Sequence, residues 1–175
     1  MNTENAVYFS GKDDIYGLFK KIINSSENYI WIQAYYFTDI RIADFLLSAG
    51  KRGVAVTVLA DKKGALSKYS VVPYLIMNKV TVYCDYKPEK AHDKVLIFDD
   101  EGVITGSYNF TVSASKYNAE NALLIKDAGI VRKYKENFIK RRSSTFEFIL
   151  IPENYTIKDN QINVITSRGV KSAYI

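Results

Sequence analysis

The 175-residue sequence contains one cysteine and one histidine, Cys84 and His92. A single cysteine excludes a disulfide within the chain, and one cysteine with one histidine is too few ligands for a His/Cys zinc site. No stretch approaches the roughly 18 uncharged apolar residues of a membrane-spanning helix. The first residues, Met1–Ala6, are polar and lack a basic segment leading into an apolar run. We therefore expect a cytoplasmic protein with no export signal and no membrane insertion.

The composition indicates one folded unit with a short appendage. Hydrophobic residues make up 47% of the chain and aromatic residues 14%, which is enough for a sizeable core. We expect one domain over residues 1–142 and a C-terminal β extension over residues 143–175, where strand-like patterns recur at Phe146–Ile151 and Ile162–Ile165. The 24 Lys and Arg exceed the 19 Asp and Glu and give a net charge of +5, which suits an anionic partner without requiring one.

Strand and helix patterns alternate along the first 142 residues. The segments with strand patterns are Val7–Phe9, Tyr29–Ala34, Val54–Leu59, Val80–Cys84, Val95–Phe98, Val103–Thr105 and Asn121–Ile125. The first helix pattern follows a Ser10/Asp13 capping box, and the second runs from Thr38 or Asp39 through Leu47. The third covers Ala65–Asn78 with a break at Pro73, and the fourth covers Ala128–Arg142 after the cap Asp127. This order predicts an α/β fold, a sandwich with a central mixed, largely parallel sheet flanked by helices.

The chemistry-bearing residues lie between positions 92 and 120. On a strand, His92 and Lys94 are two residues apart and point to the same face, which sets an imidazole beside an ammonium and suits an anion. Ser107 and Asn109 come just after the next predicted strand, where a hydroxyl and an amide can converge on the same oxygens. Glu120 opens a third strand and is the candidate to hold one imidazole nitrogen, leaving the other free to attack.

The spacing His-x-Lys-x4-Asp, formed by His92, Lys94 and Asp99 and followed by Gly-Ser-x-Asn at residues 106–109, resembles the signature of the phospholipase D superfamily. The chain is most similar there to the small bacterial Nuc-type endonucleases, which carry one such motif per chain and a later carboxylate in an Asn-x-Glu-Asn context, here residues 118–121. The resemblance extends upstream to residues 33–38 and 52–54 and covers roughly residues 5–142. The tail lies outside it.

The resemblance implies a phosphodiesterase that uses no metal and no cofactor, forms a covalent phosphohistidine, and builds one site from two copies of the motif. His92 would attack phosphorus, and His92 of a second chain would protonate the leaving oxygen. Lys94 and Asn109 would hold the non-bridging oxygens, with help from Ser107. Because the chain has one histidine, a second imidazole requires a homodimer.

The resemblance also assigns supporting roles to two carboxylates. Glu120 would orient His92, and Asp99 would be a buried organiser of the motif. Independently of the family, the acidic run Asp99–Glu101 before a glycine is typical of a hairpin turn, so we predict no metal site there.

Other residues are candidates for substrate contacts. Lys62, Lys63 and Lys68 follow the Val54–Leu59 strand, and ligands of open α/β sheets lie outside the carboxyl ends of strands. Tyr108, between Ser107 and Asn109, is the tyrosine most suited to stack on an unpaired base. The basic run within Arg132–Arg142 fits the solvated face of a helix.

We expect a nuclease that cleaves DNA with little sequence preference, with RNA and single strands as further substrates. Three alternatives stay open: a phospholipase D-like hydrolase of cardiolipin-like lipids, a nuclease subunit of a restriction or defence system, and a binding protein that has lost turnover. The intact motif argues against the last of these.

Overall fold

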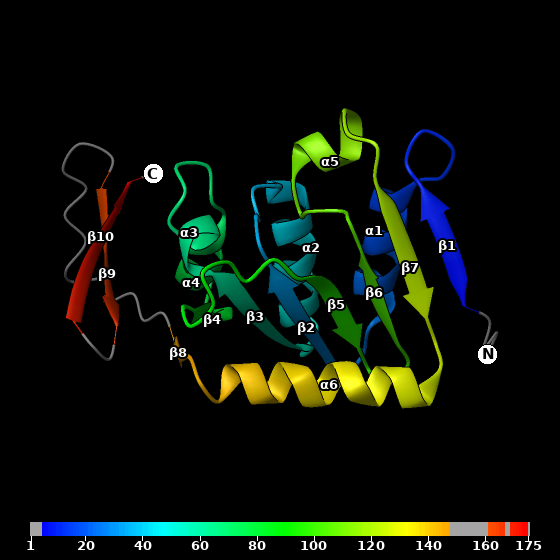
Figure 1. Cartoon of the computed structure of the whole chain (residues 1–175). Coiled ribbons are helices and arrows are strands. Elements are labelled where there is room, and N and C mark those ends of the chain that lie inside the picture. Colours follow the sequence, from blue (N-terminus) through cyan, green and yellow to red (C-terminus); the bar gives the residue numbers. More distant parts are fainter. Residues whose placement is uncertain (1–4, 148–160, 167–168, 175) are drawn as a thin grey trace.

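The computed structural model describes residues 5–147, 161–166 and 169–174, and it contains an eight-stranded sheet with helices on both faces (Figure 1). The strands are β1 (Ala6–Phe9), β2 (Tyr29–Ala34), β3 (Ala55–Asp61), β4 (Thr81–Asp85), β5 (Lys94–Phe98), β6 (Gly102–Gly106), β7 (Asn121–Ile125), β8 (Phe146–Glu147), β9 (Gln161–Thr166) and β10 (Gly169–Tyr174). The helices are α1 (Ile15–Ser25), α2 (Ile40–Lys51), α3 (Lys62–Ala65), α4 (Val72–Met77), α5 (Val112–Lys116) and α6 (Ala128–Arg142).

The sheet is mixed, as expected, but it is not largely parallel. Its strand order is β1-β7-β6-β5-β2-β3-β4-β8. Only the pairs β2–β3 and β3–β4 are parallel, and the first of these is the predicted βαβ unit with α2 as its crossover. The other five pairs of this sheet are antiparallel, and two of them, β5–β6 and β6–β7, join strands that are consecutive in the chain.

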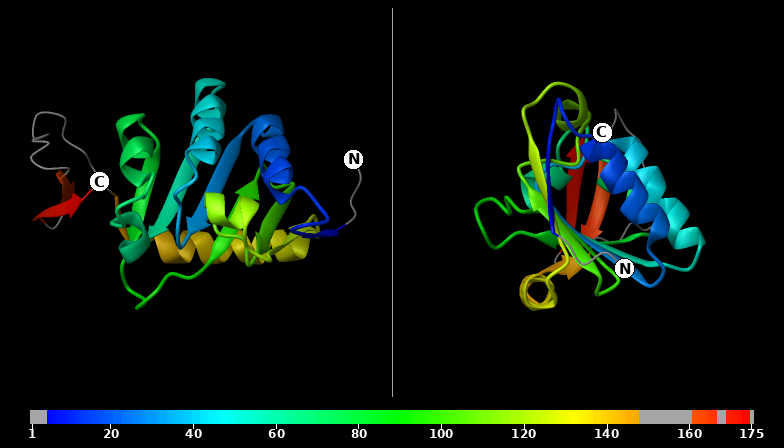
Figure 2. Two further views of the ribbon diagram at one scale, coloured as in Figure 1. Left: turned by 90° about the horizontal axis from the view of Figure 1, so that it is seen from above. Right: turned by 90° about the vertical axis from the view of Figure 1, so that its right-hand side faces the viewer.

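Helices cover the two faces unequally. Figure 2 shows α1 and α2 on one face and α6 alone on the other. The apolar positions of α1, including Leu18, Phe19 and Ile22, recur at helical spacing and are buried in the larger core cluster. On the other face Trp31 stacks on Phe138 of α6, with ring centroids 4.9 Å apart. Both faces of the sheet are therefore buried around β2 and β5.

The predicted caps are confirmed at two helices and wrong at one. Asp39 caps α2 and Asp127 caps α6, but α1 is capped by Asp14, whose side chain accepts from the backbone N–H of Gly17. The carboxylate of Asp13 accepts instead from a backbone N–H before the helix. A capping-box pattern therefore located the start of α1 to within a turn and assigned the wrong residues to it.

The helix predicted over Ala65–Asn78 is replaced by two short helices, α3 and α4. Pro73 lies in the first turn of α4, where its missing N–H costs no helical hydrogen bond. The proline thus begins a helix here and does not interrupt one.

One edge of the sheet collects the ends of several strands, and we call it the carboxyl edge. β2, β3 and β4 end there, at Ala34, Asp61 and Asp85. β5 runs antiparallel to β2 with Lys94 opposite Ala34, so β5 begins at this edge. β6 therefore ends there and β7 begins there. The carboxyl edge is at the top of Figure 1, and the opposite edge carries the β5–β6 turn.

The tail contributes strands to two sheets. β8 pairs with β4 at the end of the main sheet, and β9 pairs with β10 in a separate two-stranded sheet. The predicted strand near Ile162–Ile165 is confirmed as part of β9. Of the strand predicted over Phe146–Ile151, β8 confirms the first two residues, and residues 148–151 lie outside the described part. The domain division at residue 143 stays a prediction.

None of the helices in the described part of the chain combines the length and the hydrophobicity needed to cross a bilayer.

Candidate active site

His92 and Lys94 lie together at the carboxyl edge, where β5 begins. His92 is exposed, whereas Lys94 is only 7% exposed. The Lys94 ammonium donates to the backbone oxygen of His92 at 2.6 Å, and its Nζ is 2.9 Å from Nδ1 of the imidazole. Burial lowers the pKa of Lys94, because desolvation disfavours the charged form. The predicted imidazole and ammonium pair is present on one face.

Tyr35 forms one wall of this pair. Its ring centroid is 4.3 Å from that of His92, and Nζ of Lys94 is 5.0 Å from its centre. Tyr35 directly follows β2, the strand beside β5, so the sheet itself sets these contacts. The ring fills the space next to the imidazole and limits its rotation.

Ser107 and Asn109 follow β6 at the same edge. Gly106 lets the backbone approach β7 closely, since a Cβ there would overlap the carbonyl oxygen of Asn121. Ser107 then binds both ways to Asn121: its N–H donates to the Asn121 carbonyl, and its hydroxyl accepts from the Asn121 N–H. Oδ1 of Asn109 is buried and finds no hydrogen-bond partner among the described residues. The side-chain amide of Asn109 also carries two N–H donors, the kind of group that can bind a phosphate oxygen.

Glu120 is held by neighbours other than His92. The hydroxyl of Ser107 donates to Oε2, and Nδ2 of Asn118 donates to Oε1 at 2.9 Å. The backbone N–H of Glu120 donates to Oγ of Ser10 at 2.7 Å. Among the described residues the expected hydrogen bond from His92 to Glu120 is absent, and the carboxylate accepts instead from Ser107 and Asn118.

Asp61 is a buried carboxylate that the sequence reasoning missed. It ends β3, is 1% exposed, and accepts from the N–H groups of Gly64 and Ala91, both at 2.8 Å. The first bond caps α3, and the second fixes the residue before His92. A Cβ at Gly64 would overlap the carbonyl oxygen of Tyr35, so α3 packs directly on the segment that carries the Tyr35 ring. Asp61 thus connects three parts of the site.

Arg141 connects the C-terminal end of α6 to the segment between β4 and β5, which carries His92. Its guanidinium binds the carboxylate of Asp85, at the end of β4, with Nε 2.8 Å from Oδ2. It also approaches Asp93, the residue after His92, at 3.8 Å. The segment between β4 and β5 is therefore held at both ends, by Asp85 and by the residues that flank His92.

Asp99 lies at the opposite edge, at the other end of β5. Five residues of extended chain separate it from Lys94 by about 16 Å. Its carboxylate accepts from the N–H groups of Glu27, Asn28 and Tyr29, at 2.7, 2.9 and 2.8 Å. The structure therefore does not bring Asp99 to the other candidate catalytic residues. It organises the loop between α1 and β2.

The candidate substrate contacts divide into surface and core residues. Lys62, Lys63 and Lys68 are exposed, and the first two directly follow Asp61 at the carboxyl edge. Tyr108 is 2% exposed, and its ring centroid lies 5.3 Å from that of Phe19 in α1. Burial raises its pKa to about 12. The expectation that Tyr108 stacks on a base is corrected, because alternation along the chain turns its side chain into the core between Ser107 and Asn109.

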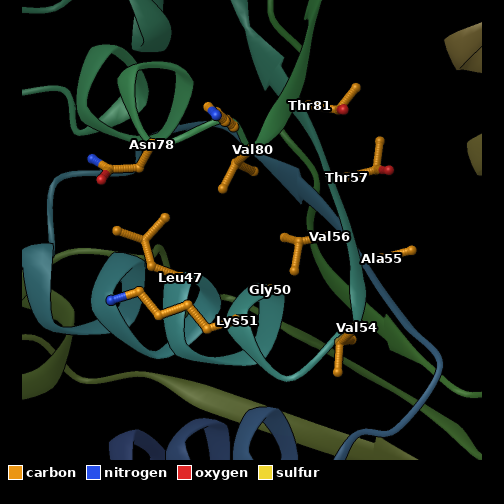
Figure 3. Close-up of a pocket in the computed structure, with 11 residues that line it drawn as sticks. Leu47, Gly50, Lys51, Val54, Ala55, Val56, Thr57, Asn78, Val80 and Thr81 are labelled. Carbon is orange, nitrogen blue, oxygen red and sulfur yellow. The ribbon is translucent and has the colours of Figure 1, made fainter.

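Other features of the surface lie apart from these residues. A pocket of about 460 Å³ lies between α2 and the beginnings of β3 and β4. Figure 3 shows residues that line it, among them Leu47, Val56 and Val80. The pocket lies at the opposite edge of the sheet and contains none of the candidate catalytic side chains. Within residues 5–147, 161–166 and 169–174, no three His, Cys, Asp or Glu side chains gather as they would around a metal ion.

Comparisons with known proteins identify a family and several relatives that this chain resembles. A family model described as cardiolipin synthase, PLD-like domain, matches residues 19–142. A phospholipase D from Rickettsia prowazekii is 42% identical over 123 residues, which are 70% of this chain and 60% of that protein. A mitochondrial cardiolipin hydrolase from Xenopus tropicalis is 34% identical over 97 residues, which are 55% of this chain and 46% of that protein. The chain thus spans about 60% of the length of the first of these relatives and less than half of the second.

A solved structure has the same fold. Nuc from Salmonella typhimurium, a phospholipase D family member, superposes with a TM-score of 0.78 at 29% sequence identity. The match covers 83% of this chain and 98% of Nuc. The mixed sheet flanked by helices is therefore the fold of a solved phospholipase D family member.

Proposed function

The chain belongs to the phospholipase D superfamily, and from that premise we propose that it is a phosphodiesterase that cleaves nucleic acid, DNA above all, through a covalent phosphohistidine. The observation that carries the proposal is the pairing of an exposed imidazole with a nearly buried ammonium, His92 Nδ1 and Lys94 Nζ being 2.9 Å apart. Ser107 and Asn109 lie at the same edge of the sheet. Together these groups offer one nucleophile and several donors to a phosphate.

The chemistry proceeds in two displacements. A neutral imidazole nitrogen of His92 attacks phosphorus, the bond to the leaving oxygen breaks, and that oxygen takes a proton from a second imidazole. Water then attacks the phosphohistidine and gives its proton to the second imidazole, which restores His92 and releases the phosphomonoester. Charge that develops on the non-bridging oxygens is met by the ammonium of Lys94 and the amide of Asn109, which are fixed before the reaction begins.

The second imidazole is proposed to come from a second copy of the chain. His92 is the only histidine in the sequence, so one chain cannot supply both a nucleophile and an imidazole acid. His92 is exposed and lies two residues before β5 at the carboxyl edge, where it is accessible to a partner. A two-fold axis that passes between two such residues would place both imidazoles on one phosphorus.

Several features favour nucleic acid as the substrate. The chain carries a net charge of +5, and Lys62 and Lys63 stand exposed beside the residue that fixes Ala91 and His92. Lysines at the edge of a phosphodiesterase site can contact the successive phosphates of a long polyanionic strand. The resemblance to Nuc-type endonucleases points the same way.

A lipid phosphodiesterase is the second candidate. The names of the relatives favour it, since one is a phospholipase D and another a mitochondrial cardiolipin hydrolase. The same His92 and Lys94 pair would serve a lipid phosphodiester, because the reacting group is identical.

One assay separates the two candidates. Purified protein is incubated with supercoiled plasmid, a single-stranded oligonucleotide, RNA and cardiolipin vesicles, each with and without a chelator. The proposal expects cleavage of nucleic acid that persists in chelator and weakens steeply between about 50 and 200 mM salt as counterion release is lost. Turnover of cardiolipin alone would favour the second candidate, and full loss in chelator with recovery in magnesium would contradict the metal-independent mechanism.

A further inference from the structure

The tripeptide Ser-Lys-Tyr occurs twice in the sequence, at residues 67–69 and 115–117. Tyr69 is 72% exposed and Tyr117 is 79% exposed. These are the two most exposed large hydrophobic side chains in the part of the chain whose side chains the structure describes. Each has a lysine directly before it, and both lysines, Lys68 and Lys116, are exposed. We call residues 67–69 and 115–117 the SKY segments.

The two segments have similar local structure. Ser67 comes just after α3, and its hydroxyl donates to the carbonyl of Gly64, three residues earlier, at 2.9 Å. Ser115 lies in the last turn of α5, and its hydroxyl donates to the carbonyl of Val112, again three residues earlier and at 2.9 Å. Each serine thus anchors the end of a short helix, and the lysine and tyrosine that follow point away from the core.

Both segments are fixed to the chain that follows β2, from opposite sides. After the first segment, the N–H of Val71 donates to the carbonyl of Phe37 at 2.9 Å. Before the second, the carbonyl of Phe110 accepts from the N–H of Thr38 at 2.9 Å, and Ser115 accepts from Arg41 at 2.9 Å. Figure 1 shows α5 and the loop after α3 standing at the carboxyl edge on either side of this region.

His92 and Lys94 lie between the two strands from which the SKY segments extend. The first segment follows β3 and the second follows β6, and the strands between them in the sheet are β2 and β5. Three strand spacings separate β3 from β6, which is about 14 Å. His92 precedes β5, so it lies within this interval.

We propose that the SKY segments hold an unpaired nucleic-acid strand on either side of the scissile phosphate, Tyr69 and Tyr117 by stacking on bases and Lys68 and Lys116 by binding backbone phosphates. This inference rests on the proposed nuclease function and narrows its substrate class to single-stranded nucleic acid. A tyrosine can stack only on a base whose face is free, which a continuous duplex does not present. Stacking accepts every base, so sequence preference stays weak.

The arrangement fits a strand better than a membrane surface. A membrane-binding face needs contiguous apolar side chains backed by cations. Here the two tyrosines belong to segments that follow different strands, β3 and β6, and each has a lysine before it and a polar residue, Ser70 or Asn118, after it. Two separate aromatic contacts, each with one cation, match a chain that alternates bases with phosphates.

The test compares cleavage and binding of a single-stranded oligonucleotide, the same sequence as a duplex, and the same strand with abasic positions beside the cleavage site. In the full chain, Tyr69→Ala and Tyr117→Ala should each raise KM for the single strand by about 5- to 100-fold. Tyr69→Phe and Tyr117→Phe keep the ring and should stay close to wild type. On the abasic strand, tyrosine and alanine should perform alike, because no base is present to stack.

Met77→Ala is the matched control, since Met77 is 58% exposed at the end of α4 that faces away from the carboxyl edge. It should change none of these values. Four results would each overturn the inference. The alanine variants could lose activity equally on the single strand and the duplex, or lose none on the single strand. The phenylalanine variants could lose activity, or the alanine variants could convert a dimer to a monomer. If wild type cleaves duplex DNA and the tyrosine variants do likewise, the nuclease function stands without it. If wild type cleaves only cardiolipin vesicles, both fail.

Discussion

The two ends of β5 carry residues of one sequence motif, yet they have different tasks. At the carboxyl edge, His92 is exposed, Nζ of Lys94 lies against its imidazole, and the ring of Tyr35 packs beside both. At the opposite edge, Asp99 places its carboxylate on three backbone N–H groups and is occupied entirely by the loop before β2. A motif that is continuous in sequence is thus split by a strand into a chemical end and a structural end.

The difference shows in how each end is stabilised. Asp99 and Asp100 adopt left-handed backbone angles, with φ of 48° and 56°, which aspartate tolerates better than most residues. The turn they form satisfies its own carboxylates through Tyr29, Lys135 and backbone groups. The carboxyl edge instead keeps Lys94 partly desolvated, with a lowered pKa, and leaves an amide atom of Asn109 without a partner among the described residues. A desolvated cation and an unpartnered amide atom thus belong to residues of the carboxyl edge, whereas the turn at the opposite edge pairs its carboxylates.

The largest effect is expected at the chemical end. His92→Ala removes the nucleophile and should lower turnover by about 10⁴-fold or more. The exposed imidazole packs against little besides Tyr35, so the melting temperature should change little. Cleavage rates and thermal unfolding of the same preparation check both statements, and near-normal cleavage by this variant would refute the motif assignment.

Removing the phosphate donors should cost less. Lys94→Ala and Asn109→Ala should each lower kcat by about 10²-fold, because each removes one fixed donor from the developing charge. Ser113→Ala is a matched control on the neighbouring helix α5. Steady-state kinetics check the prediction, and a rise in KM with unchanged kcat would show that these residues only bind substrate.

At the structural end, a substitution should change the free energy of unfolding and not the turnover. Asp99→Ala leaves three N–H groups without their charged acceptor and should lower the free energy of unfolding by about 1–3 kcal/mol. Turnover per folded molecule should stay within about twofold of wild type, since the site is some 16 Å away. Urea unfolding followed by kinetics on the folded fraction measures both, and a selective loss of turnover would contradict the division between the two ends.

Substituting Asp61 should have a smaller effect on turnover, which arises because Asp61 positions the residue before His92. Asp61→Asn can accept from only one of its two N–H partners, so it should release Ala91 and lower kcat by roughly tenfold with little change in KM. Asp39→Asn is the control, because Asp39 is also a buried helix cap at the carboxyl edge and, in the part of the chain that the structure describes, makes no hydrogen bond with Ala91.

The single histidine provides a direct readout of positioning. The imidazole resonances in an NMR spectrum belong to His92 alone, so Asp61→Asn should shift or broaden them and Asp39→Asn should not. Equal spectra for both variants would reduce Asp61 to a stabilising cap.

Much of the fold could be predicted from local patterns. The strand Asn121–Ile125 and the helix Ala128–Arg142 have the same bounds in sequence and structure, because a clear apolar pattern and the Asp127 cap define them. The direction of each strand in the whole sheet was harder to predict from the sequence. Local patterns identify a βαβ unit, but whether β5 pairs with β2 or with β4 depends on contacts between distant residues.

The site followed the same rule. His92, Lys94, Ser107 and Asn109 are close in sequence and could be assigned to one edge from strand alternation. Ser10 could not be found, since it contacts Asn118 and Glu120 across more than a hundred residues without any local signal. Asp61 had a signal that was overlooked, a carboxylate between a buried strand and a glycine three residues on. The prediction that Tyr108 contacts a base was wrong, because its place between Ser107 and Asn109 in the sequence does not reveal that its ring is buried.

The central claim is that two chains share one site at the carboxyl edge, and mixed dimers test it most directly. Wild-type and His92→Ala chains are refolded together at several ratios and assayed on the best nucleic-acid substrate. If each site needs an imidazole from both chains, activity should follow the square of the wild-type fraction, about a quarter of full activity in an equal mixture. A linear dependence, with about half of full activity in that mixture, would contradict the shared site.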